Sequence, residues 1–310
     1  MKSDNSYTID KTQRKLGPIW LSPGVQPKNV LTMFYSAAMA IGFINLLNLI
    51  QPLLLQDLLG MSSGEGNFTA IIYVALEITT LVCAAPLANL SDQIGRQPIF
   101  TIGFIIIFIA MIFIPTARTG LELGVYRIVA SVGIACCTTM IASLMADYPQ
   151  NASRGKYIGI NGFCSALGVI IIGTGLTQMP KFFSDMGYSA IESISYTLWF
   201  GSALAFITAV VTFAGIKKGL TTKQTQKLPF IENAKTGLSA IVKSPRLILG
   251  CGATLMSRGD LVVLATFFSL WVQKLGADKG LESVVASATA GQLFGLMQVA
   301  MLLSLPVIAA

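Results

Sequence analysis

The sequence predicts an all-α polytopic membrane protein, and two observations lead to this class. Hydrophobic residues make up 54% of the 310-residue chain and charged residues only 11%, a composition that a water-soluble globule of this length does not tolerate. Apolar runs of about 20 residues, each long enough to cross a hydrocarbon core of about 30 Å as a helix, recur along the whole chain. The predicted spans are 29–50, 66–88, 98–115, 121–146, 156–179, 194–215, 246–273 and 288–310.

The spans fall into two groups separated by a basic segment. Residues 1–28 form a polar, basic tail without the apolar core of a signal peptide. Six spans occupy 29–215, a linker occupies 216–245, and two spans occupy 246–310. The last run ends at Pro306–Ala310 without a polar flank. We therefore expect the chain to be truncated relative to a complete protein of its kind.

The placement of basic residues predicts the orientation. The N-terminal tail, the linker and the alternating loops on their side carry 15 lysines and arginines, whereas the opposite loops carry only Arg118, Lys181, Lys274 and Lys279. Cytoplasmic loops carry the excess of Lys and Arg, so the tail and the linker are predicted to be cytoplasmic, in a plasma membrane of the bacterial inner-membrane kind. The net charge of +7 then reflects orientation and a possible contact with anionic lipid headgroups, and not nucleic-acid binding.

Several kinds of chemistry are absent from the sequence. The chain has no histidine, which excludes a His-ligated metal and a Ser/His/Asp triad. It has no phosphate-binding loop of the G-x-x-x-x-G-K-S/T type, so ATP does not drive it directly. We expect no enzyme activity, no cofactor and no metal; the sequence leaves the oligomeric state open.

A charged turn, Leu90–Pro98, separates the second and third spans. Gly95 supplies the backbone freedom that a tight turn needs. Asp92 lies near a helix C-terminus, where its charge is unfavourable unless a cation compensates it, and Arg96 is near enough to do so.

This stretch resembles the loop signature G-x-L-x-D-R-x-G-R-R of the major facilitator superfamily. It keeps Leu90, Asp92, Gly95 and Arg96, and departs at Ala88, Gln93 and Gln97. Two later motifs are similar to the same family: Leu123–Arg127 matches L-x-x-x-R, and Ala146–Pro149 followed by Arg154–Lys156 matches the loop between the fourth and fifth helices.

The resemblance implies a major facilitator-like fold, here a six-helix N-terminal bundle plus the first two helices of the second bundle. It also implies alternating access, in which two bundles rock about a central site. Asp92, Gly95 and Arg96 would then form a conformational gate that holds the cytoplasmic ends of the bundles together. Asp147 and Arg154 would form a second charge cluster there.

Charged and polar residues inside the spans are the candidates for a transport pathway. A charge at a helix centre costs about 2.5–3.5 kcal/mol on insertion scales, so it usually faces a cavity or a partner. Asn45 and Asn48 share one helix face, as do Arg127 and Ser131; for the uncharged residues, helix packing and a cavity are equally good explanations. The predicted pathway residues are Asn45, Asn48, Glu77, Arg127, Ser131, Arg258 and Asp260.

These residues predict a secondary transporter of a small solute. Arg127 and Arg258 favour a substrate with an anionic group. Glu77 and Asp260 are the candidates for proton coupling, although a structural ion pair explains them equally well. Two alternatives stay open: an efflux antiporter for drugs or cations, and a membrane scaffold or sensor that keeps the fold without transport.

Overall fold

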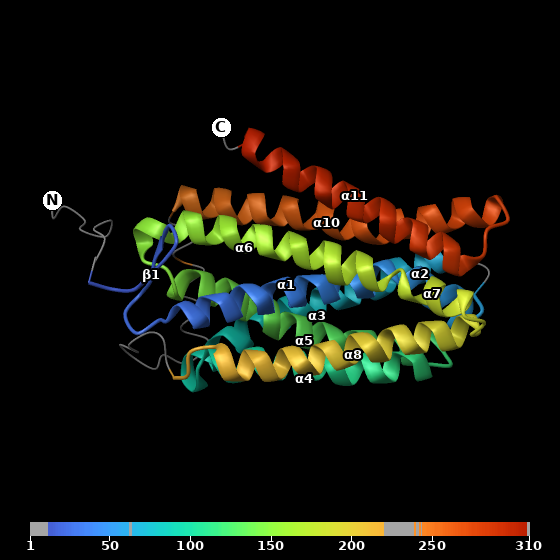
Figure 1. Cartoon of the computed structure of the whole chain (residues 1–310), viewed down its shortest axis with the longest axis horizontal. Helices are drawn as coiled ribbons and strands as arrows, with labels where there is room; N and C mark the ends of the chain where they lie inside the picture. Colours follow the sequence, from blue (N-terminus) through green and yellow to red (C-terminus); the bar gives the residue numbers. More distant parts are fainter. Residues whose placement is uncertain (1–11, 62–63, 220–238, 240–241, 243, 309–310) are drawn as a thin grey trace.

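The computed structural model describes residues 12–61, 64–219, 239, 242 and 244–308, without the side chains of 246–247, 251, 253–266 and 304–308. The chain is almost entirely helical, and its long helices run side by side (Figure 1). The elements are β1 (Lys15–Leu16), β2 (Ile19–Trp20), α1 (Pro27–Leu49), α2 (Gln51–Leu53), η2 (Leu54–Leu58), α3 (Glu65–Ile94), α4 (Arg96–Phe113), η3 (Ile114–Thr116), α5 (Gly120–Asp147), η4 (Asn151–Ser153), α6 (Arg154–Gly168), η5 (Val169–Thr174), α7 (Met179–Asp185), α8 (Ala190–Gly215), α10 (Pro245–Asp278) and α11 (Ser283–Ile308).

Seven of the eight predicted spans are confirmed as helices long and apolar enough to cross a membrane. The predicted span 246–273 falls in α10, most of whose central side chains lie outside the described residues. The outer face of α3 exposes a row of large apolar side chains, including Ile71, Ile78 and Leu81. Hydrocarbon solvates such a face, so the all-α polytopic membrane class is correct.

Local signals in the sequence set the ends of the helices. Thr119 caps α5 by accepting a hydrogen bond from the Glu122 amide, and Ser189 and Glu192 form a capping box at α8. Gly95 alone separates α3 from α4, with φ at +100°, a conformation that few residues other than glycine adopt. The predicted turn at 90–98 is therefore a single-residue break between two helices.

The first six spans pack around α1. Phe43, Leu46 and Leu47 of α1 are fully buried, and α1 contacts α5, α6, η5 and α8. Helix α4 packs between α5 and α8, and α3 packs on α5. Helices α10 and α11 pack on each other and lie against α1, α2, η5 and α7. We call the end of the molecule that carries β1, β2 and Gly95 the hairpin end, and the end that carries Gly64, Thr119 and Ser189 the distal end.

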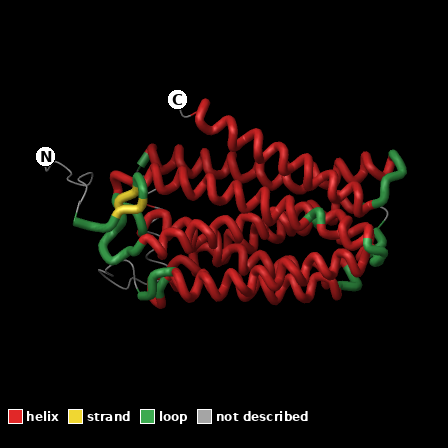
Figure 2. The backbone as a smooth tube through the Cα atoms, viewed as in Figure 1, coloured by secondary structure: helices red, strands yellow, loops and turns green. Residues whose placement is uncertain are grey.

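Part of the N-terminal tail is folded, which no pattern in the sequence indicates. Strands β1 and β2 form a short antiparallel hairpin at the hairpin end (Figure 2). The Trp20 amide donates to Ser153 Oγ at 3.0 Å, and the Ser22 amide donates to the Tyr148 carbonyl at 2.8 Å. Ile19 and Leu21 are buried. The segment after β2 is therefore fixed against the loop between α5 and α6.

Candidate functional site

A cavity of about 420 Å³ lies between α1, α3, α5, α6, η5 and α11. Five of the seven predicted pathway residues line it, although they come from three different helices: Asn45, Asn48, Glu77, Arg127 and Ser131. Gln298 and Met301 of α11 line it from the other side. The cavity is thus bounded by both groups of helices.

Arg127 is the dominant charge in this wall. It is 2% exposed, and its Nη2 donates to Asn48 Oδ1 at 3.3 Å and to Tyr73 Oη at 3.4 Å. Both distances lie beyond the usual range for N–H···O bonds. Its Nε has no hydrogen-bond partner among the described residues, and it forms no ion pair within that part of the chain. The buried guanidinium therefore retains an unused donor at the wall of the cavity.

Tyr73 is the residue that sequence reasoning missed. Its hydroxyl donates to Asn48 Oδ1 at 2.9 Å, and its ring lies 5.9 Å from the Arg127 guanidinium carbon, within the range of a cation–π contact. The signal was available, since Tyr73 precedes Glu77 by four residues and so shares its helix face.

Two predicted pathway residues cannot be placed against this cavity. Arg258 and Asp260 belong to α10, and their side chains lie outside the described residues. Their roles stay predictions.

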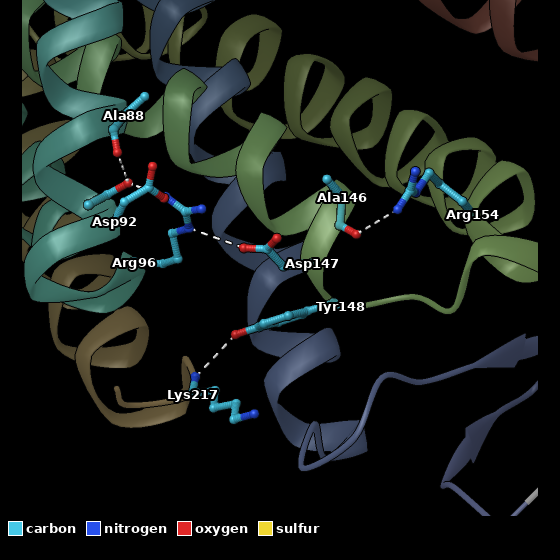
Figure 3. A network of polar contacts seen from close by, with 9 residues as sticks. Ala88, Asp92, Arg96, Ala146, Asp147, Tyr148, Arg154 and Lys217 are labelled. Atoms are coloured by element: carbon cyan, nitrogen blue, oxygen red, sulfur yellow. Dashed lines mark hydrogen bonds and ion pairs between the residues drawn. The ribbon is translucent and has the colours of Figure 1, made fainter. Parts of the chain in front are cut away.

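A cluster of charges occupies the hairpin end (Figure 3). Arg96 lies 2.6 Å from Asp92 Oδ1 through its Nη1 and donates from its Nε to Asp147 Oδ2 at 3.1 Å. Its Nη1 also contacts Ser91 Oγ, which donates to the Ala88 carbonyl at 2.7 Å. Arg96 thereby links the ends of α3 and α5 to the start of α4.

The pairing of Asp147 with Arg154 does not form in this structure. Asp147 pairs with Arg96 instead, whereas Arg154 donates to the Ala146 carbonyl at 3.1 Å (Figure 3). The reason is geometric: Arg96 opens α4 beside the end of α5, while Arg154 opens α6 beyond the intervening loop.

Tyr148 joins two helix ends at the hairpin end of the molecule. Its buried hydroxyl accepts a hydrogen bond from the Lys217 amide at 3.1 Å (Figure 3), which ties the end of α8 to the end of α5. Burial raises the pKa of Tyr148 to about 12, because the phenolate loses hydration that the phenol does not need.

Contacts between the two groups of helices gather at the distal end, in what we call the distal seam. Ser283 Oγ donates to Asp57 Oδ2 at 2.6 Å, and Gln178 Nε2 donates to the Ala288 carbonyl at 2.8 Å. Gly291 and Gly295 of α11 approach Thr177 and Thr174 so closely that a methyl group on Gly291 would lie 2.0 Å from Thr177 Oγ1. These two glycines, four residues apart on α11, thus permit a close approach of the two backbones.

Comparison with known proteins agrees with this architecture. The family model of the Major Facilitator Superfamily matches residues 33–310. The magnetosome protein MamH of Paramagnetospirillum magneticum is 26% identical over 284 residues, which are 89% of this chain and 63% of that protein. The multidrug resistance protein MdtL of Shewanella oneidensis is 28% identical over 125 residues, covering 40% of this chain and 31% of that protein.

The crystal structure of the nucleoside transporter NupG shares the fold with a TM-score of 0.64 at 14% identity, over 92% of this chain and 67% of that one. The chain spans less than two thirds of the length of MamH. The motif at Asp92–Arg96, the helical architecture and the match over residues 33–310 lead to one conclusion: the chain belongs to the major facilitator superfamily.

Proposed function

We propose that this protein is a secondary active transporter that moves a small solute with an anionic group by alternating access. The observation that carries the proposal is the buried, incompletely bonded guanidinium of Arg127 in the wall of the 420 Å³ cavity. The family is one of transporters, and the cavity lies between two groups of helices that could move relative to each other.

The energetics of Arg127 favour an anionic ligand. Removing a charge from water costs several kcal/mol even after relaxation, whereas a good hydrogen bond to a charged group contributes only about 1.5–3 kcal/mol. The contacts of Arg127 to Asn48 and Tyr73 are long, and its Nε is unbonded within the described structure. A carboxylate or phosphate in the cavity would supply the missing acceptors.

The proposed moving bodies are the six-span group at 29–215 and the group that begins at 246, joined by the linker at 216–245. We take the hairpin end as cytoplasmic, because it carries the basic loops, in a bacterial inner membrane. Asp92, Gly95 and Arg96, with Asp147, form the proposed gate there. Because its described contacts join α3, α4 and α5, the cluster would act by holding these helix ends rigid for docking of the other body.

Glu77 is the proposed proton carrier. It lines the cavity from the same helix face as Tyr73, and carboxylates inside membrane spans commonly serve in proton relays. Asp260 is the alternative carrier. Protonation of either would couple solute movement to a proton gradient.

The test is transport by the full-length protein in proteoliposomes with an imposed pH gradient. The panel contains labelled mono- and dicarboxylates, inorganic phosphate and a neutral sugar. Arg127→Met should abolish uptake of the preferred anion, and Arg127→Lys should retain part of it. Arg118→Met, which removes an exposed arginine, is the matched control and should transport normally. Wild-type rates in Arg127→Met would disprove the role of this residue.

A second candidate is efflux of apolar or cationic compounds. It is favoured by Glu77 in a cavity whose wall is otherwise largely apolar, and the similarity to MdtL over 125 residues points the same way. A labelled lipophilic cation added to the panel separates the two: an exporter of cations keeps its activity in Arg127→Met, whereas the first proposal requires that Arg127→Met abolishes transport.

A further inference from the structure

The polar side chains around the cavity differ in whether they can still bind a ligand. By residue type the wall is well supplied with hydroxyls and amides, which is typical of a site for sugars or nucleosides. Their hydrogen bonds argue against such a site, because most of these donors are already bonded within the protein.

Helix backbone carbonyls take up the hydroxyl protons on α3 and α5. Thr80 Oγ1 and Ser131 Oγ both donate to the Leu76 carbonyl, at 3.0 and 2.9 Å. Thr138 Oγ1 donates to the Ile134 carbonyl at 3.0 Å. A hydroxyl bonded to its own or a neighbouring helix has no proton left to give a ligand.

Asn45 follows the same pattern on α1. Its Nδ2 donates to the Ile41 carbonyl at 2.9 Å. Around these groups the wall consists of aliphatic side chains, among them Ile41, Ile44, Ile134 and Val169. The parts of the wall that α1, α3 and α5 contribute therefore offer a ligand mainly apolar contact and few free hydroxyl donors.

The exception is the corner formed by Arg127, Asn48 and Tyr73. There the guanidinium has an unpartnered Nε, and its two bonds from Nη2 are long. Glu77 adds a carboxylate to the same wall. Like charges repel strongly where water is scarce, so a second negative charge on the ligand would be opposed.

We infer that the cavity binds an amphipathic monoanion: one carboxylate or equivalent group at Arg127, attached to an apolar body that carries few or no hydroxyls. The inference rests on the proposed function and specifies its substrate class. A polyhydroxylated ligand would lose hydrogen bonds to water over most of its surface and regain few of them. A neutral ligand would leave Arg127 unpaired.

A matched set of six-carbon compounds tests the inference by equilibrium binding to the full-length protein in detergent. Hexanoate has the expected chemistry. Gluconate adds hydroxyls, hexanamide removes the charge, and adipate adds a second carboxylate. We expect hexanoate to bind at least tenfold more tightly than each of the other three, and Glu77→Gln to reduce the preference for hexanoate over adipate.

Two substitutions link the binding to the proposed corner. Arg127→Met should weaken hexanoate binding at least tenfold, with Arg118→Met as its control. Asn48→Asp places a carboxylate of the same shape beside Arg127. It should also weaken hexanoate binding tenfold or more while raising the melting temperature of the ligand-free protein, so loss of binding is not mistaken for misfolding.

The outcomes separate this inference from the proposed function. If gluconate binds at least as tightly as hexanoate and its binding depends on Arg127, the claim that the ligand has an apolar body is wrong. The proposal of an anion transporter would still stand. If adipate binds as tightly as hexanoate, the claim that the ligand carries only one negative charge is wrong. Hexanamide binding as tight as that of hexanoate, or hexanoate binding that survives both Arg127→Met and Asn48→Asp, would overturn the anion site itself and with it the proposed function.

Discussion

The two ends of the molecule are held together in different ways. At the distal end, α11 bonds directly to the first group of helices, through Ser283 and Asp57 and through Gln178 and Ala288. At the hairpin end, the described polar contacts do not join α10 or α11 to the other helices: the Arg96 cluster joins α3, α4 and α5, and Lys217 of the linker bonds to Tyr148. The free end of α11 separates from the other helices (Figure 1).

Glycines along α6 and α11 show the same difference. Gly291 and Gly295 sit against Thr177 and Thr174 at the distal end. Gly155 and Gly159, near the start of α6 at the hairpin end, would tolerate a methyl group with no described atom within 4 Å. Small residues thus permit close packing at the distal seam, whereas the exposed glycines near the start of α6 face open space.

The distal seam is closely packed, yet its polar groups are incompletely bonded. Gln51 of α2 and Gln273 of α10 are buried, and neither side-chain amide has a hydrogen-bond partner among the described residues. Ser287 Oγ and Thr174 Oγ1 are also buried without a hydrogen-bond partner among the described residues. Each such group costs about 1–3 kcal/mol. Water could satisfy all four if the seam opened, so the seam is suited to reversible separation.

The largest effect is expected from Arg96→Ala. It leaves Asp147, 16% exposed in its side chain, without a cation, and we expect a loss of about 3 kcal/mol in the free energy of unfolding, at the low end for a buried pair. Unfolding in detergent measures it, with Arg154→Ala as the control that should change stability by less than about 0.5 kcal/mol. Equal losses in both variants would contradict the assignment of Asp147 to Arg96.

The second prediction concerns Tyr148 and pH. Between pH 10 and 12 the unfolded chain loses the tyrosine proton while the folded chain keeps it, because its folded pKa is about 12. The contribution to stability is therefore complete below pH 10 and is lost as the pH rises through 12, by about 2.7 kcal/mol in total. Tyr148→Phe should lose less stability than wild type over this range. Identical pH profiles of the two proteins would show that the Tyr148 hydroxyl does not cause the loss of stability at high pH.

The third prediction compares the two glycine positions. Gly291→Ala forces a methyl group against Thr177 and should cost about 1–2 kcal/mol through overpacking. Gly159→Ala meets open space and should be neutral or stabilise by up to about 1 kcal/mol, since alanine favours the helix. Thermal unfolding of the two variants measures the difference. Equal destabilisation would mean that the seam is closed at both ends, and the comparison would fail.

The sequence predicted the helices well because span length and apolarity alone determine them. It also predicted the proximity of Asp92 and Arg96, which are four residues apart across a single glycine. It could not predict the partner of Asp147, because Arg154 is the nearby arginine in sequence, whereas Arg96 is 51 residues away and only the packing of α4 on α5 brings it to Asp147.

The cavity shows the same limit. Helical spacing placed Asn45 and Asn48, and Arg127 and Ser131, on shared faces, and the structure brings both pairs to one cavity. The distal seam could not be predicted from the sequence, since Ser283 and Asp57 are 226 residues apart and neither lies in a distinctive motif. The folded hairpin was also missed, because its buried residues are too few to form a recognisable apolar run.

The smallest expected effect, from Ser283→Ala, addresses the comparison most directly. The substitution removes the hydrogen bond to Asp57 and should cost only about 1 kcal/mol of stability, because Asp57 is only partly buried and water can replace the hydroxyl. If that bond helps close the distal seam, the population with an open seam should rise about fivefold, since 1.4 kcal/mol corresponds to a factor of ten. The readout is the rate at which a membrane-impermeant maleimide labels a cysteine at Ser287, which is 1% exposed. Ser195→Ala, which removes a hydroxyl bonded within its own helix, should leave this rate unchanged. A rate that does not respond to Ser283→Ala would mean that apolar packing alone closes the distal end, and the polar contacts would then be a consequence of closure rather than a cause.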